Sequence, residues 1–84
     1  MDQENKICPW ERISDFDGWI EFERFEAWLR NQTIDGDADE IPVLKSYNEV
    51  CKFQEKWFIH RLSGQIWRLV WPEPPFAGLF EKVS

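Results

Sequence analysis

A run of carboxylates between residues 35 and 40 is the part of the sequence whose residue types most directly suggest chemistry. It reads Asp35-Gly-Asp37-Ala-Asp39-Glu40. Alternating carboxylates open the calcium loop of an EF-hand, but that loop requires Gly at its sixth position and Glu at its twelfth. This chain has Glu40 and Ser46 at those positions. A solvated acidic loop, or an acidic patch that docks on lysine or arginine of a partner, therefore fits the run better than a calcium site.

The lone histidine and the two cysteines are the other side chains with obvious reactivity. His60 precedes Ser63 at the spacing of a hairpin turn, and no Gly-x-Ser-x-Gly elbow accompanies it. Cys8 and Cys51 belong to no Cys-x-x-Cys pair, so they do not form a zinc-ligand pattern, and the sequence leaves open whether they pair with each other. A chain of 84 residues also has little room for a two-carboxylate cleft. We therefore expect no catalytic residue, no metal and no cofactor, and hence a protein that is not an enzyme.

Charge is unevenly distributed along the chain. Residues 1–40 have a net charge of −8 and residues 41–84 a net charge of +2, for a total of −6. An acidic half of this kind repels nucleic acid and anionic membranes and favours a basic partner protein, although acidity for solubility alone is the alternative. The carboxylates that we expect to bind the partner are Glu23, Asp35, Asp37, Asp39 and Glu40.

Length and composition predict one small acidic domain over residues 1–84, with residues 1–5 frayed. A chain of this size has a small core, which six Trp and seven Phe would reinforce. Its first residues are polar and acidic, unlike a secretory signal, and no apolar run approaches the ~20 residues of a membrane span. These features predict a cytoplasmic protein with reduced thiols and leave the oligomeric state open.

The expected fold class is α+β: one helix packed on a small antiparallel sheet with an aromatic-rich C-terminal hairpin. The helix is predicted over residues 19–31, with Ser14 and Asp17 as candidate N-caps. Its apolar positions share one face at i, i+3, i+7 spacing: Phe22, Phe25 and Leu29. The hairpin is predicted from two aromatic and β-branched runs at 53–60 and 66–71, joined by a Gly-containing turn. One face of the hairpin looks like core and the other is mixed; the core face is expected to hold Phe53, Trp57 and Ile59 of the first run and Trp67, Leu69 and Trp71 of the second.

Four further segments are expected around the helix and hairpin. A polar loop is predicted over residues 33–40, and residues 72–75 contain three prolines that break the sheet. Strands are predicted at 41–44 and 79–83, and residues 7–13 form either an edge strand or an extended lead-in because Pro9 removes a backbone donor.

Residues 55–72 carry a family resemblance. They read EKWFIHRLSGQIWRLVWP, which is an aromatic strand, a Gly turn and a second Trp-containing strand that ends in an aromatic-Pro pair. Together with the Gly-containing strand that follows, this pattern resembles small immunity proteins of bacterial polymorphic toxin systems and covers about the last third of the chain. The resemblance implies a cytoplasmic bacterial protein that binds and neutralises a cognate toxin without a cofactor.

The sequence therefore predicts a non-enzymatic protein-binding domain, of the inhibitor or immunity type, that engages a basic partner through an acidic face. The alternative is an accessory or structural subunit that docks through the aromatic hairpin and the Pro-rich segment 72–76. A third use of the aromatics, as a platform for single-stranded nucleic acid, is opposed by the overall acidity of the chain. The identity of the partner is left open.

Overall fold

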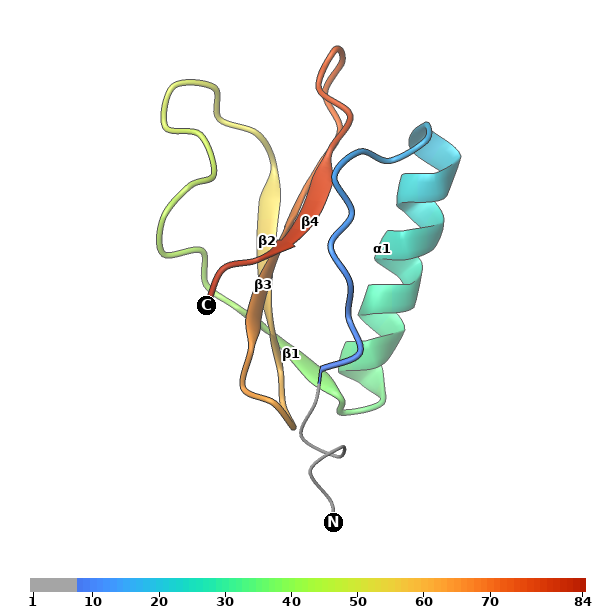
Figure 1. Cartoon of the computed structure of the whole chain (residues 1–84), viewed down its shortest axis with the longest axis vertical. Helices are drawn as coiled ribbons and strands as arrows, with labels where there is room; N and C mark the ends of the chain where they lie inside the picture. The colour runs from blue at the N-terminus through green and yellow to red at the C-terminus, as the bar shows by residue number, and fades with distance from the viewer. Residues whose placement is uncertain (1–7) are drawn as a thin grey trace.

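The computed structural model describes residues 8–84 as one helix packed on a four-stranded antiparallel sheet (Figure 1). In chain order the elements are α1 (Trp19–Ile34), β1 (Ala38–Ile41), β2 (Glu55–His60), β3 (Ile66–Val70) and β4 (Leu79–Lys82). Each strand pairs with its neighbour in sequence, in the order β1-β2-β3-β4. The α+β class, the aromatic hairpin of β2 and β3, and the final strand are confirmed. The predicted frayed end, 1–5, and the first residue of the predicted segment 7–13 lie outside the described residues.

The helix forms on the predicted apolar face. Phe22 and Leu29 are fully buried and Phe25 packs beside them. The start of the helix differs from the prediction, because the N-cap is Gly18 and no side chain caps it. The side chain of Glu21 instead reaches back and accepts a hydrogen bond from the backbone N–H of Asp17 at 2.6 Å, which satisfies one donor at the helix start.

The segment that follows the helix corrects two predictions. The helix continues to Ile34, and Gly36 (φ 87°) turns the chain into β1, so residues 33–40 are not one loop. The predicted strand at 41–44 is also wrong, since the strand ends at residue 41, just before Pro42, which has no N–H for a ladder bond. The strand β1 forms because it pairs with β2. The first residue of β1, Ala38, is completely buried.

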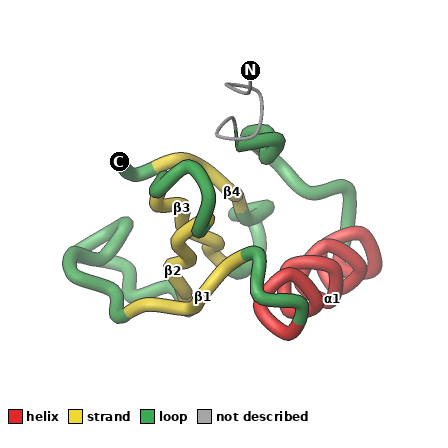
Figure 2. Tube along the Cα trace, turned by 90° about the horizontal axis from the view of Figure 1, so that it is seen from below, coloured by secondary structure: helices red, strands yellow, loops and turns green. Residues whose placement is uncertain are grey.

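Both faces of the sheet are covered. One face packs on α1 and the N-terminal segment, and the other lies toward the long connection over residues 42–54 (Figure 2). The register places Phe58 opposite Trp67 on the helix side and Trp57 opposite Arg68 on the other. Trp57 is only 4% exposed. The expectation of one core face and one mixed face is therefore replaced by two packed faces, of which the helix side holds the larger cluster: Trp10, Phe16, Phe22, Leu29, Ala38, Phe58, Trp67, Leu69 and Phe80.

The N-terminal segment is an extended lead-in with a single strand-like contact. Ile13 and Phe80 exchange two backbone hydrogen bonds of 2.9 Å, so the segment lies against the free edge of β4. Further along, the N–H of Phe16 donates to the carbonyl of Ala77 at 3.3 Å. Trp10 is buried against the sheet, with its ring 6.1 Å from that of Trp67.

A charged side chain at the centre of the other face holds the 42–54 connection on the sheet. The guanidinium of Arg68 lies 3.6 Å from a carboxylate oxygen of Glu55 and 3.3 Å from one of Glu81. It also lies over the rings of Tyr47 and Trp57, at 5.5 and 5.7 Å. Glu55 in turn accepts hydrogen bonds from the Tyr47 backbone N–H and the Trp57 indole. Connection and sheet are thus joined through one partly buried ionic cluster.

Replacing the central cation, Arg68, should therefore lower the free energy of unfolding more than replacing an exposed cation does. The Glu55 side chain is 5% exposed, so Arg68→Met leaves a buried carboxylate without its cation and should cost about 3 kcal/mol in the free energy of unfolding. Arg12→Met is the matched control, because Arg12 is 68% exposed and 3.9 Å from Glu81, and it should cost less than about 0.5 kcal/mol. Urea unfolding of both variants measures the difference, and equal losses would contradict a structural role for the cluster.

Candidate protein-binding surface

The five carboxylates predicted to bind a partner do not form one face. Glu23 is exposed on α1, Asp35 and Asp37 lie in the turn after the helix, and Asp39 and Glu40 are part of β1. Glu23 and Asp35 are twelve residues apart, about 18 Å along a helix at its usual rise. The structure therefore brings together Asp35 and Asp37, places the two β1 residues beside them, and leaves Glu23 apart.

The turn between α1 and β1 is built by backbone hydrogen bonds that leave its two carboxylates exposed. The N–H groups of Asp35 and Asp37 donate to helix carbonyls at 2.9 Å, and the carbonyl of Asp37 accepts from the N–H of Arg61 at the end of β2. Asp35 is the C-cap of the helix, and the last turn carries no basic residue. Within residues 8–84, neither carboxylate forms an ion pair.

The position of these two charges is electrostatically unfavourable for the isolated chain. The C-terminal end of a helix carries roughly half a negative charge, so basic residues are stabilising there and acidic ones are not. Asp35 and Asp37 add two full negative charges at that end. We refer to this turn, residues 35–37, as the acidic turn. A cation brought by another molecule would be attracted both by the carboxylates and by the helix dipole.

Asp39 is already neutralised within the molecule. Its carboxylate accepts two hydrogen bonds from the guanidinium of Arg61, at 2.7 and 3.0 Å. These hydrogen bonds hold the pKa of the Asp39 carboxyl below its usual range, and they raise the pKa of Arg61 for the same reason. Asp39 therefore presents a dipolar ion pair to a partner, whereas Asp35 and Asp37 present net charge.

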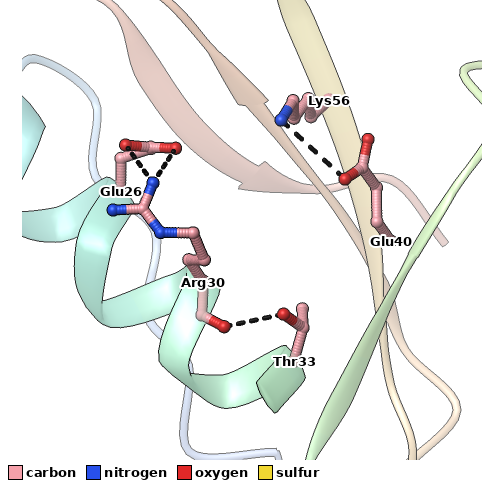
Figure 3. A network of polar contacts seen from close by, with 5 residues as sticks. All are labelled: Glu26, Arg30, Thr33, Glu40 and Lys56. Carbon is pink, nitrogen blue, oxygen red and sulfur yellow. Dashed lines mark hydrogen bonds and ion pairs between the residues drawn. The ribbon is translucent and has the colours of Figure 1, made fainter.

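Glu40 points to the other face of β1, as alternate residues of a strand do. Its carboxylate lies 3.8 Å from the ammonium of Lys56 on β2. Figure 3 shows this pair facing a second one on α1, where Arg30 and Glu26 lie 3.3 Å apart. The two pairs line a small cleft of about 90 Å³ whose lining includes Phe58. No ion pair crosses this cleft among the described residues, and the four charges cancel.

The histidine and the cysteines are placed as follows. His60 is 6% exposed, and its Nδ1 lies 2.9 Å from the hydroxyl oxygen of Ser63. The same hydroxyl oxygen accepts a hydrogen bond from the backbone N–H of Gln65. This pair therefore closes the β2–β3 turn. Cys8 and Cys51 are both free thiols. Among residues 8–84, no group of three or more His, Cys, Asp or Glu side chains is arranged to hold a metal ion.

The structure also reveals carboxylates that the sequence reasoning did not assign to a binding surface. Asp15, Asp17 and Glu21 are exposed around the start of α1, at the opposite end of the helix from the acidic turn. Glu73 is exposed in the β3–β4 connection. In the sequence Asp17 looks like a helix cap and Glu73 stands among prolines, so neither has a pattern that predicts its neighbours in space.

No protein-family model matches the chain, and no curated protein or solved structure is significantly similar to it. No helix within residues 8–84 is long and apolar enough to cross a membrane. The resemblance of residues 55–72 to immunity proteins accordingly stays a prediction. What the fold and its surface define is a small α+β protein with an acidic turn at one end of its helix.

The ion pair between Asp39 and Arg61 leads to a prediction about pH. Arg61→Gln should raise the pKa of the Asp39 carboxyl toward its usual range, because the hydrogen bonds that depress it are lost. Since the pKa is depressed in the folded state, the pair stabilises the fold above the unfolded-state pKa, and this contribution disappears as the pH falls through the folded-state pKa.

A carbon-detected NMR titration of the Asp39 carboxyl measures this shift. Lys56→Gln is the matched control, because it removes a neighbouring cation that pairs with Glu40 and not with Asp39. A pKa of Asp39 that responds equally to both substitutions would show that general charge, and not the paired geometry, sets its value.

Proposed function

We propose that the chain is a non-enzymatic protein-binding domain of the inhibitor or immunity type, which acts in the cytoplasm on a basic partner protein. The observation that carries this proposal is the acidic turn. Asp35 and Asp37 are exposed at the negative end of α1, where their carboxylates form no ion pair in the described part of the chain. Charges that disfavour the free protein and attract a cation are better explained by binding than by folding.

The remaining carboxylates contribute unequally to this proposal. Glu23 adds negative potential along the exposed side of α1. Asp39 and Glu40 each have a cation of their own, so they supply hydrogen-bond acceptors at the edge of the surface more than net attraction. A negative surface of this kind speeds the encounter with a basic protein by long-range steering. The family resemblance adds that the partner is a toxin and that binding neutralises it.

The alternative of docking through the aromatic hairpin has less support. Trp57, Phe58 and Trp67 are 4–5% exposed, so these rings stabilise the fold and are not available to a partner. In the Pro-rich segment, Pro74 and Pro75 are exposed.

Charge reversal at the acidic turn tests the proposed function. The proteins encoded by the genes that flank the coding sequence supply the candidate partners, and surface plasmon resonance measures their association rates. For the double variant Asp35→Lys/Asp37→Lys we expect the association rate to fall about tenfold or more, because steering is lost. The matched control is Glu49→Lys, which reverses an exposed charge in the 42–54 connection and should change the rate little.

Salt provides the second arm of this experiment. The screening length falls from about 30 Å at 0.01 M to about 3 Å at 1 M salt, so the unmodified complex should form much more slowly at the higher concentration. The double variant should respond less to salt than the unmodified protein. An association rate that is independent of both salt and charge reversal would contradict binding through the acidic turn.

A further inference from the structure

An apolar groove lies at the other end of the helix from the acidic turn. In Figure 1 the start of α1 and the β3–β4 connection both lie at the upper end of the molecule, while the α1–β1 turn is at the lower end. The groove has a volume of about 270 Å³. Its main walls are rings from these two segments: Phe16, Trp19, Pro72, Pro74, Pro75 and Phe76. We call it the Trp19 groove.

The walls of the Trp19 groove are held in place by short backbone contacts. Glu73 and Phe76 exchange two hydrogen bonds of 2.9 Å. A Cβ at Gly78 would lie only 3.0 Å from Pro72, so the two ends of the connection touch. Behind the wall, the Phe76 ring packs 4.5 Å from that of Phe53. A ligand would therefore meet a surface that is already formed, which lowers the entropic cost of binding.

The groove offers few free backbone N–H donors to a ligand. Three of its walls are prolines, which have no N–H, and the N–H of Phe76 already donates to Glu73. The carbonyl of Ala77 likewise accepts from Phe16. Proline residues of a ligand have no N–H to bury, and their extended chains dock on aromatic-lined grooves in several protein families.

Shape and exposure agree with such a ligand. Trp19 is 51% exposed, so its ring forms an accessible wall. The volume is below the roughly 300–1,000 Å³ of sites for drug-sized molecules. It suits a few apolar side chains of an extended segment.

The charges around the groove select among proline-containing ligands. Asp17 and Glu73 are exposed and adjoin lining residues at the two segments that form the groove. Among residues 8–84, no lysine or arginine lines it. At this end of β2, Lys56 lies over the ring of Trp71 and beside Glu40. The groove borders the N-terminal end of α1, whose dipole carries roughly half a positive charge, but the full negative charges of Asp17 and Glu73 exceed it. A ligand with cations on either side of its apolar part is therefore complementary to the rim of the groove.

We propose that the Trp19 groove docks an extended, proline-containing segment of a partner protein that carries arginine or lysine on both sides of its apolar residues. The proposal deepens the proposed function, and rests on it in taking the partner to be a basic protein. It adds a second contact, about one helix length from the acidic turn. Binding through the groove supplies apolar burial and specificity, whereas the acidic turn supplies charge attraction.

NMR with synthetic peptides tests the groove directly. The probe is a short peptide of alternating proline and leucine with arginine at each end, added to the full ¹⁵N-labelled chain up to about 1 mM, which detects weak binding. The chain has six Trp and so six indole N–H signals, of which Trp19→Phe identifies one. We expect the probe to shift the Trp19 signal and leave that of the buried Trp67 in place.

Variants then separate the groove from the acidic turn. Trp19→Ala should weaken the probe at least about tenfold, as truncation of an aromatic anchor does. Trp19 is half exposed, and the spectrum of the remaining residues verifies that the variant is folded. A second variant, Asp17→Asn/Glu73→Gln, keeps every ring and should weaken the probe several-fold. Asp35→Lys/Asp37→Lys should leave probe binding unchanged, so a failure of the acidic turn and a failure of the groove give different results.

Two further peptides complete the test. One has glutamate in place of arginine, and the other keeps arginine but has glycine and serine in place of proline and leucine. Neither should bind as well as the probe. The proposal is overturned if the probe causes no shift at Trp19, or if either altered peptide binds equally, since charge or apolar contact alone would then account for the result.

Discussion

The stacking of Phe80 on Trp67, with ring centroids 4.8 Å apart, connects the sheet to both segments that cover its helix side. The Phe80 ring also lies 4.8 Å from that of Phe25 on α1 and 5.7 Å from that of Trp10. Its backbone pairs with Ile13. One completely buried residue thus fixes the helix, the N-terminal segment and two strands relative to one another. In so short a chain, such aromatic contacts replace the larger aliphatic core of a bigger protein.

The uneven distribution of charge along the sequence is also present in the folded structure, where the acidic residues of the two halves have different surroundings. The second half of the chain uses two of its four acidic residues internally, since Glu55 and Glu81 both lie beside Arg68. In the first half, the carboxylates at both ends of α1 are exposed. The central ion cluster of the fold therefore uses charges of β2, β3 and β4, whereas Asp35 and Asp37 form no ion pair among the described residues. This division explains why we assign folding to Glu55 and Glu81 and charge attraction to Asp35 and Asp37.

The sequence predicts the elements with strong periodicity and misses those that depend on pairing. Phe22 and Leu29 repeat at helical spacing, and the aromatic runs of the hairpin flank a Gly turn, so both were predictable. By contrast, β1 contains Asp39 and Glu40 and has no strand pattern, because it forms by pairing with β2. The sequence predicts that the acidic turn carries carboxylates. It does not predict that these carboxylates lie at the negative end of the helix dipole. The Trp19 groove was not predictable, since its walls are more than fifty residues apart in sequence.

The two edges of the sheet are the places where a strand of another copy of the protein could be added. At one edge, β1 carries the charged residues Asp39 and Glu40 and is followed by Pro42. At the other, Ile13 occupies backbone groups of β4. Short, charged or covered edges are the features by which natural sheets avoid adding a foreign strand. This sheet is thereby protected from open-ended growth into aggregates by strand addition.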